Sequence, residues 1–317
     1  MTVRTGVIGV GSMGRHHARI YDQMLNVELI GVTDVDTEAA KEVADQRDTA
    51  VFDRGELLDR VDAVSIAVPT PFHYEIAREC IDAGVDVLVE KPFVAEPERG
   101  ELLVERAAAN DVLLQVGHVE RFNPAVVALR EVIQDLDVIS LDARRLGPTP
   151  DRQIDDSVVM DLMIHDLDIV NSIVGGEPGD VSVAGSRAGK HATTTITFPD
   201  ETIATLTASR VTQEKIRQLT ITAEECYVKV DYLDQSIDIH RQSVPEYVVT
   251  NGDVRFRHES IVERPVVDNT EPLKNELSSF TDAVRTRSQP VVTGEDGLRA
   301  VFLARNVDER AFPDRYA

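Results

Sequence analysis

The chain has 317 residues, which exceeds the usual length of one domain and is too short for three, so two domains are expected. Hydrophobic residues make up 42% of it, enough for a sizeable core, but no run of about 18 apolar residues could span a bilayer. The formal net charge of −23 disfavours nucleic acid and other polyanions as partners.

The first part of the chain alternates short apolar segments with helical stretches. Strands are expected at residues 7–8, 27–32, 63–68, 85–89 and 112–116, with helical spacing of apolar residues at 36–47 and 71–83. This rhythm is typical of a parallel sheet with helices on both faces. We therefore predict a doubly wound Rossmann domain over residues 1–118.

The pattern changes after Gly117. Helices are expected at 123–136, 158–173, 272–286 and 294–310, and strands at 193–198, 202–208, 219–223, 227–230 and 236–240. This run predicts a second α/β domain over residues 119–317, built on a large open, mostly antiparallel sheet. One face of that sheet would rest on helices, and the other is a candidate oligomer surface.

A glycine motif marks the expected cofactor site. Gly9-Val10-Gly11-Ser12-Met13-Gly14 follows a strand and opens a helix, so its glycines would allow a tight turn and close approach of a pyrophosphate to the helix N terminus. Asp34, twenty residues past Gly14 at the end of the second strand, would accept both ribose hydroxyls and repel a 2′-phosphate. No Arg follows closely, so NAD is favoured over NADP. His16 and His17, behind the motif, are expected on the helix surface.

Three polar segments follow later strands, at the sheet edge where doubly wound folds bind ligands. They are Val68-Pro69-Thr70-Pro71-Phe72-His73, Glu90-Lys91-Pro92 and Gly117-His118. We predict that Pro69, Thr70, His73, Glu90, Lys91 and His118 contribute to the cofactor site, and that Lys91 also meets a substrate oxygen. The Glu90-Lys91-Pro92 segment by itself could equally be a turn that carries a surface Lys.

A helix in the second domain carries further polar residues. Asp161, His165 and Asp168 stand at i, i+4 and i+7 of an otherwise apolar segment, so they would share one helix face. A solvated polar stripe would give the same pattern. A metal pair is also conceivable, but no third ligand has convincing spacing and hydride transfer to nicotinamide needs none, so no metal is expected.

Residue usage also indicates the environment of the protein. Acidic residues outnumber basic ones by 56 to 33, an acid-rich composition that resembles proteins of salt-accumulating halophiles. Cys80 and Cys226 lie far apart without CxxC spacing, which favours neither a disulfide framework nor a thiolate zinc site. The N terminus reaches Val7 and Ile8 without the regions of a signal peptide, so a cytoplasmic location is expected.

These segments together resemble the glucose-fructose oxidoreductase / inositol dehydrogenase (Gfo/Idh/MocA) family. The resemblance rests on the glycine motif, VPTPFH, EKP, GHVERFNP at 117–124 and the DLMIHD helix, and it extends to residues 271–273 and 292–297. It implies a Rossmann domain, a C-terminal domain on a large open sheet, and homodimers or homotetramers formed through that sheet. It also implies that Lys91, Asp161 and His165 act at the substrate carbon. Leu162 and Met163 stand where the family often has Gly, a departure at the substrate side.

The resemblance also implies a reaction. GHVERFNP and the MIHDLDIV helix are most similar to dehydrogenases that oxidise the 3-hydroxyl of UDP-N-acetylglucosamine or its uronate. We therefore expect an NAD-dependent oxidoreductase in which His165, oriented by Asp161, takes the hydroxyl proton and Lys91 stabilises the developing alkoxide. Which of Lys91 and His165 moves the proton stays open.

Two alternatives accompany this expectation. The first is a dehydrogenase of free inositol or aldose, which a basic diphosphate pocket near Arg121, Arg144 or Arg145 would argue against. The second is a dinucleotide-binding sensor or scaffold without catalysis. The joint presence of Lys91, Asp161 and His165 disfavours it, because a dead site has no reason to keep all three.

Overall fold

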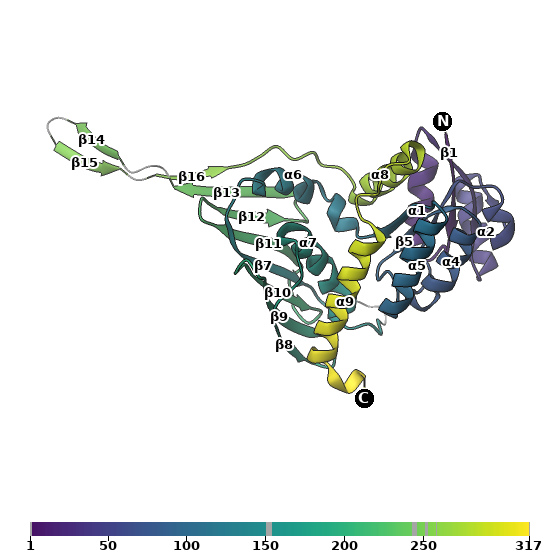
Figure 1. Cartoon of the computed structure of the whole chain (residues 1–317). Helices are drawn as coiled ribbons and strands as arrows, with labels where there is room; N and C mark the ends of the chain where they lie inside the picture. Colours follow the sequence, from purple (N-terminus) through teal and green to yellow (C-terminus); the bar gives the residue numbers. More distant parts are fainter. Residues whose placement is uncertain (1, 150–153, 243–245, 251–252, 258, 317) are drawn as a thin grey trace. The chain divides into compact units, whose positions relative to one another are not determined.

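The computed structural model describes residues 2–149, 154–242, 246–250, 253–257 and 259–316. The chain divides into two compact units, residues 1–122 with 270–303 and residues 123–269 with 304–317 (Figure 1). This division differs from the expected single boundary after residue 118, because a C-terminal segment returns to the first unit. Among the helices of the described segments, none combines the length and hydropathy needed to cross a bilayer.

The first unit is built on a six-stranded parallel sheet of order β3-β2-β1-β4-β5-β6. The strands are β1 (Val3–Ile8), β2 (Val27–Thr33), β3 (Ala50–Val51), β4 (Ala63–Ile66), β5 (Asp86–Glu90) and β6 (Leu114–Gly117). The chain adds β2 and β3 on one side of β1, and then adds β4, β5 and β6 on its other side. Doubly wound sheets bind ligands at such a switch point, beyond the carboxyl ends of the strands.

Helices cover this sheet and complete its core. They are α1 (Ser12–Gln23), α2 (Thr37–Arg47), α3 (Arg54–Leu58), α4 (His73–Asp82), α5 (Pro97–Ala109) and α8 (Pro272–Thr286), with 3-10 turns η1 (Thr70–Phe72) and η2 (Val119–Phe122). The apolar face of α8, with Leu277 and Phe280, joins the core cluster around Tyr21 of α1. That burial explains why a segment from the end of the sequence belongs to the first unit.

The second unit is built on an eight-stranded sheet of order β16-β13-β12-β11-β7-β10-β9-β8. Its strands are β7 (Val138–Leu146), β8 (Val181–Ser186), β9 (His191–Thr197), β10 (Ile203–Ser209), β11 (Ile216–Ala223), β12 (Tyr227–Asp231), β13 (Ser236–Gln242) and β16 (Ser260–Glu263). Only the β7/β10 pairing is parallel among its described pairings. Strands β14 (Glu246–Thr250) and β15 (Asp253–Arg257) form a separate pair. The predicted α/β class, with a parallel sheet and an open, mostly antiparallel one, is confirmed.

The two faces of the large sheet differ in polarity. The inward side chains are apolar, and α6 (Pro124–Ile133) and α7 (Ile164–Val174) pack against this side (Figure 1). The other face carries polar residues in alternation along each strand, as in Thr193, Thr195 and Thr197 of β9. The remaining helix α9 (Gly294–Ala311) contributes residues to both units, and η4 (Pro313–Arg315) follows it.

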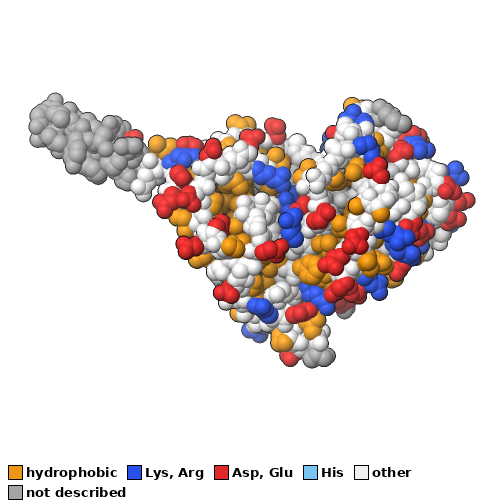
Figure 2. Space-filling model, viewed as in Figure 1, with side chains coloured by type: hydrophobic (Ala, Val, Ile, Leu, Met, Phe, Trp, Pro, Cys, Tyr) orange, Lys and Arg blue, Asp and Glu red, His pale blue; other side chains and the backbone are white. Residues whose placement is uncertain are grey.

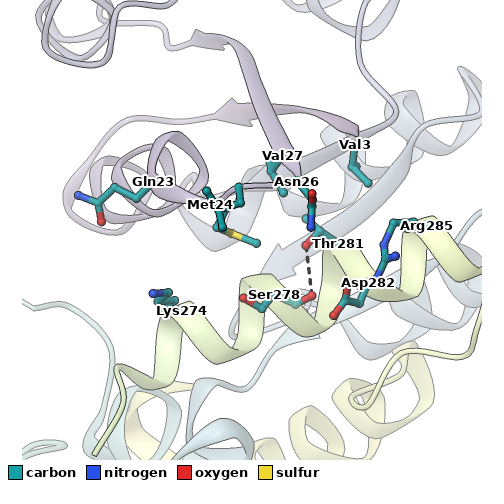
Figure 3. A pocket seen from close by; sticks show the side chains of 11 residues that line it. Val3, Gln23, Met24, Asn26, Val27, Lys274, Ser278, Thr281, Asp282 and Arg285 are labelled. Atoms are coloured by element: carbon teal, nitrogen blue, oxygen red, sulfur yellow. Dashed lines mark hydrogen bonds and ion pairs between the residues drawn. The ribbon is translucent and has the colours of Figure 1, made fainter. Parts of the chain in front are cut away.

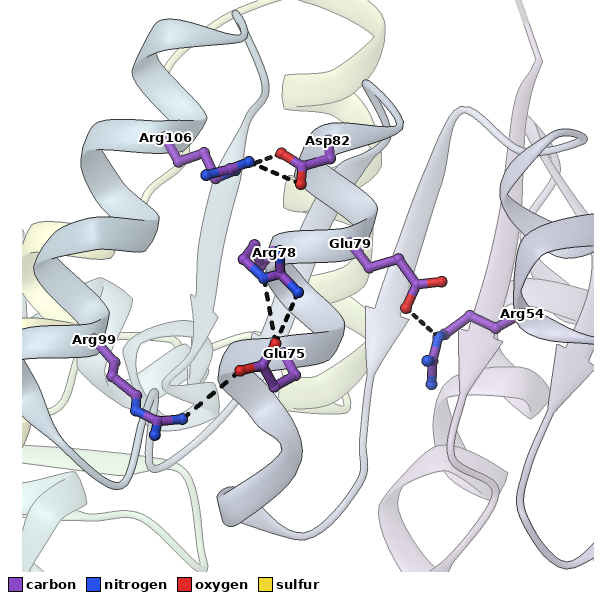
Figure 4. A network of polar contacts seen from close by, with 7 residues as sticks. All are labelled: Arg54, Glu75, Arg78, Glu79, Asp82, Arg99 and Arg106. Carbon is purple, nitrogen blue, oxygen red and sulfur yellow. Dashed lines mark hydrogen bonds and ion pairs between the residues drawn. The ribbon is translucent and has the colours of Figure 1, made fainter.

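Ion pairs are frequent on the surface of the first unit. Figure 4 shows four of them on and beside α4 and α5, with the Arg78–Glu75 and Arg54–Glu79 pairs at 2.9 Å and 2.7 Å. Each joins exposed side chains, so water and salt screen it and it contributes little to stability. Because acidic residues outnumber basic ones by 56 to 33, pairing still leaves a large surplus of negative charge.

This surplus predicts a salt-dependent fold. Figure 2 shows acidic side chains spread widely over the visible surface, with Lys and Arg among them. In dilute buffer the surplus carboxylates repel one another, whereas at about 1 M salt the screening length falls to about 3 Å. We expect the thermal unfolding midpoint to rise clearly from dilute buffer to molar KCl. Midpoints that do not differ between the two buffers would show that self-repulsion does not limit stability.

Candidate functional site

The glycine turn between β1 and α1 forms the first part of the candidate site. Gly9 has a φ of 89°, and a Cβ on it would lie 2.7 Å from the carbonyl oxygen of Ala67. At Gly14 a Cβ would lie 1.8 Å from the carbonyl oxygen of Gly9, so neither position accepts a side chain. A Cβ on Gly11 would instead meet open space, on the side from which a ligand can approach.

The N terminus of α1 is free to receive an anion. Among the described residues, no side chain caps it, and its first turn contains no acidic residue. The first N–H groups of a helix have no partner within the helix and carry partial positive charge. Ser12 and Met13 therefore offer backbone donors beside Gly11, as a pyrophosphate requires.

Asp34 lies directly after β2 and is tied to the glycine turn. Its Oδ2 accepts a hydrogen bond of 2.6 Å from the backbone N–H of Val10, and its Oδ1 accepts one of 2.9 Å from that of Asp36. The carboxylate is therefore fixed beside the turn. It occupies the position from which an acidic residue binds ribose hydroxyls in Rossmann folds.

The loops after β4 and β5 are joined by His73. Its Nε2 lies 2.8 Å from the carbonyl oxygen of Val68, and its Nδ1 lies 2.9 Å from that of Pro92. Burial lowers the pKa of His73, although these carbonyl oxygens oppose the shift. The ring is buried, whereas Pro69 is exposed and Thr70 partly exposed.

Glu90 and Lys91 stand at the carboxyl end of β5. Glu90 is buried, and its Oε1 lies 3.0 Å from Nε2 of His17. Burial alone would raise the pKa of Glu90, but the hydrogen bond with His17 and nearby positive charge outweigh it and leave this pKa below its usual value. Lys91 is partly exposed, and His118, after β6, is fully buried.

One expectation about the histidines after the glycine motif is wrong. His16 is exposed as expected, but His17 is fully buried. It shares the inward face of α1 with Ile20 and Tyr21, three and four residues further on. The i, i+3 and i+4 spacing of His17 with these apolar residues could have predicted its burial. It was not used because histidine is a polar residue that is often found on helix surfaces.

The polar helix of the second unit begins with an irregular turn. Residues Val159–Met163 form a π-helical turn, and α7 continues from Ile164. The extra residue in this turn breaks the regular i, i+4 spacing assumed for Asp161 and His165. Both side chains are partly exposed, whereas Asp168 is buried.

Asp161 is held by an arginine that the sequence motifs do not indicate. Nη2 of Arg210 lies 2.6 Å from Oδ2 of Asp161, and Nη1 donates to the carbonyl oxygen of Asp156 at 2.7 Å. Arg210 follows β10 and is itself buried. A charge-assisted bond of this kind fixes the orientation of Asp161.

The three arginines considered for a diphosphate pocket differ in burial and in partners. Arg144 is exposed and bonds to Asp142, whereas Arg145, next on the same strand, is buried and makes two bonds of 2.8 Å with Asp166. The two point to opposite faces of the sheet. Arg121 is buried in η2 of the first unit.

Two pockets among the described residues contain none of the glycine turn, Lys91, Asp161 or His165. One, of about 270 Å³, lies between α8 and the amino ends of β1 and β2, opposite the glycine turn (Figure 3). The other, of about 700 Å³, is a trough on the polar face of the large sheet, over β7, β11, β12 and β13. The described residues contain no cluster of three or more side chains suited to a metal ion.

Comparison with known proteins identifies both parts of the chain. Residues 3–118 match a family model described as an oxidoreductase family with an NAD-binding Rossmann fold, and residues 139–229 match a GFO/IDH/MocA C-terminal domain. The UDP-N-acetylglucosamine 3-dehydrogenase of Acidithiobacillus ferrooxidans is 35% identical over 310 residues, 96% of each chain. Its solved structure superposes with a TM-score of 0.89 and covers 99% of this chain and 98% of its own. An inositol 2-dehydrogenase of Rhizobium meliloti is 27% identical over 96% of this chain and 95% of its own.

Proposed function

Because the chain belongs to the Gfo/Idh/MocA family of NAD-binding oxidoreductases, we propose that it oxidises the 3-hydroxyl of UDP-N-acetylglucosamine or a close UDP-N-acetylhexosamine. The observation that carries the proposal is the 35% identity to a dehydrogenase named for that substrate, over 96% of both chains. A reaction on a CH–OH group agrees with the chemistry of Lys91 and His165.

The residues around the glycine turn fit a bound NAD. The uncapped first turn of α1 offers N–H donors to the pyrophosphate, and Asp34 offers a fixed carboxylate to the ribose. Pro69 and Thr70 are accessible enough to line the nicotinamide side. His73, Glu90 and His118 are at most 7% exposed, and His73 ties the loop after β4 to Pro92 from within. A bound NAD would supply the acceptor for the hydride that leaves the carbon carrying the reacting hydroxyl.

Side chains of this protein accept the hydroxyl proton and stabilise the negative charge that develops on the oxygen. We assign His165 as the general base that takes the hydroxyl proton, a role for which the ring must be neutral. Asp161, which Arg210 orients, is assigned to hold His165 in the tautomer that can accept this proton. Lys91 donates a hydrogen bond to the same oxygen and stabilises the negative charge that develops there.

Substrate assays test the proposal against its alternatives. NADH formation should be measured with UDP-N-acetylglucosamine, with N-acetylglucosamine and with myo-inositol, each in dilute buffer and in molar KCl. Turnover with the UDP-sugar alone supports the proposal. Turnover with free inositol favours the alternative suggested by the 27% identical inositol 2-dehydrogenase, and NAD binding without turnover on any of the three favours the sensor.

Assembly and location extend the proposal. The polar face of the large sheet carries both signs of charge around its trough, with Asp142, Arg144, Lys229, Asp231 and Asp238. Such a face can pair with its own copy, because a two-fold axis sets acidic against basic side chains. We therefore propose a cytoplasmic homodimer or homotetramer from a halophile, whose stoichiometry sedimentation in molar KCl would measure.

Asp34 gives a specific expectation for the cofactor. Asp34→Ala should weaken NAD binding by about 1 to 3 kcal/mol, the scale of a lost charged hydrogen bond. Titration of NAD and NADP against wild type and variant measures this effect. Asp36→Ala is the matched control, because Asp36 caps α2 through the N–H groups of Glu38 and Ala39 and should affect stability rather than NAD affinity. A wild-type preference for NADP would refute the role given to Asp34.

A further inference from the structure

A buried imidazole and carboxylate lie directly behind Lys91 in the first unit. His17 of α1 is fully buried, with its Nε2 3.0 Å from Oε1 of Glu90 at the end of β5. We propose that His17 is a positioning residue that fixes Glu90, and through it the backbone from which Lys91 projects. This inference rests on the proposed function, because it takes Lys91 as the group that contacts the reacting oxygen.

Glu90 is fixed from several sides at once. While Oε1 faces His17, Oε2 accepts a hydrogen bond of 3.2 Å from the backbone N–H of Lys91. On the neighbouring strand, Gly117 stands opposite Glu90 in register, and a Cβ there would lie 3.2 Å from Oε2. A side chain at position 117 would therefore crowd this carboxylate. The position of the carboxylate determines where the peptide of Lys91 lies.

The bond to Glu90 places a proton on His17. A carboxylate oxygen accepts, so Nε2 of His17 carries a hydrogen and donates it to Oε1 of Glu90. Nδ1 is buried and has no hydrogen-bond partner among the described residues. Glu90 therefore alone fixes the orientation of the ring through hydrogen bonding among the described residues.

The same pair links the cofactor turn to Lys91. Gly14 packs so closely on Gly9 that a Cβ would lie 1.8 Å from its carbonyl oxygen, and His17 follows Gly14 on the same rigid helix. The contact between His17 and Glu90 therefore connects the glycine turn, through α1, to the end of β5 that carries Lys91. An error of about 1 Å in a catalytic group can lower a rate by about 100-fold.

A neighbouring buried residue provides a matched control. Tyr21 lies one turn further along α1, is fully buried, and its hydroxyl is 2.7 Å from Oγ of Ser65 on β4. Its environment resembles that of His17, but its partner lies in the middle of a strand with no catalytic side chain beside it. Tyr21→Phe removes a buried hydrogen bond and should lower the unfolding midpoint without changing kcat.

The test is a double-variant cycle with UDP-N-acetylglucosamine and NAD. His17→Leu should lower kcat by about tenfold or more, while the Kd for NAD changes by less than about threefold, and His17→Gln, which retains a donor, should recover much of the loss. In a Lys91→Ala background, His17→Leu should lower kcat little further, because the group it positions is already absent. If His17→Leu does not fold, Glu90→Gln provides the same cycle.

The outcomes separate the inference from the proposed function. If His17→Leu keeps full kcat, or lowers it equally with and without Lys91, then His17 does not act through Lys91 and the inference fails while the proposed function stands. If Lys91→Ala itself turns over normally, both are overturned. A loss in Tyr21→Phe as large as that in His17→Leu would also contradict the inference, since it would reflect the packing of α1.

Discussion

Lys91→Ala and His165→Ala should each lower turnover of UDP-N-acetylglucosamine by about 100-fold or more, the range typical of acid–base and oxyanion contributions. The losses arise because Lys91 stabilises charge on the reacting oxygen and His165 takes its proton. Steady-state NADH formation in molar KCl measures both. NAD affinity should change little, because neither side chain is needed for the pyrophosphate or ribose contacts.

Two further observations distinguish this role from a general loss of structure. The double variant should be little worse than either single one, since both residues serve one transition state. Wild-type turnover should rise with pH through an ionisation that is missing in His165→Ala, because only the neutral ring accepts the proton. Near-normal turnover in both single variants would place the reaction elsewhere in the protein.

Arg145→Met should destabilise the second unit by about 3 to 5 kcal/mol, the cost of leaving one partner of a buried ion pair uncompensated. Arg145 makes two bonds with Asp166, both side chains are buried, and the guanidinium lies 5.4 Å from the ring centre of Tyr232. Denaturant unfolding in molar KCl measures the loss. A diphosphate ligand would behave differently, with an increase in KM for the UDP-sugar and little change in stability.

The same strand provides controls for this prediction. Arg144→Met removes an exposed arginine paired with Asp142, so its cost should stay below about 1 kcal/mol. Arg145→Met combined with Asp166→Leu should recover much of the loss, because an apolar pair replaces the buried charges. If Arg145→Met keeps wild-type stability but binds the UDP-sugar poorly, the role in folding assigned to Arg145 is wrong.

The cofactor half of the site could be predicted largely from local sequence. Gly9, Gly14 and Asp34 are recognised by their spacing around a strand, a turn and a helix, and the structure arranges them as that spacing requires. Turn geometry and helix N termini depend on a few consecutive residues, so sequence determines them. The rhythm of apolar strands and helices likewise predicted the parallel sheet, and strand alternation predicted the second sheet, with one face on helices and the other free.

The second half depended more on contacts between distant residues. The helix around Asp161 was predicted, but the π-helical turn and the bond to Arg210, 49 positions further on, were not. Arg144 and Arg145 looked alike in sequence, although one position along a strand placed them on opposite faces.

The sequence by itself thus determined the cofactor fold, the family resemblance and the candidate residues Lys91, Asp161 and His165. Only the tertiary structure decided which charged or polar side chains are buried and with which partners, as for His17 with Glu90 and Arg145 with Asp166. The physical reason is that periodicity reports the face on which a residue lies. A buried polar group also needs a partner, and that partner is supplied by chain brought close only by folding.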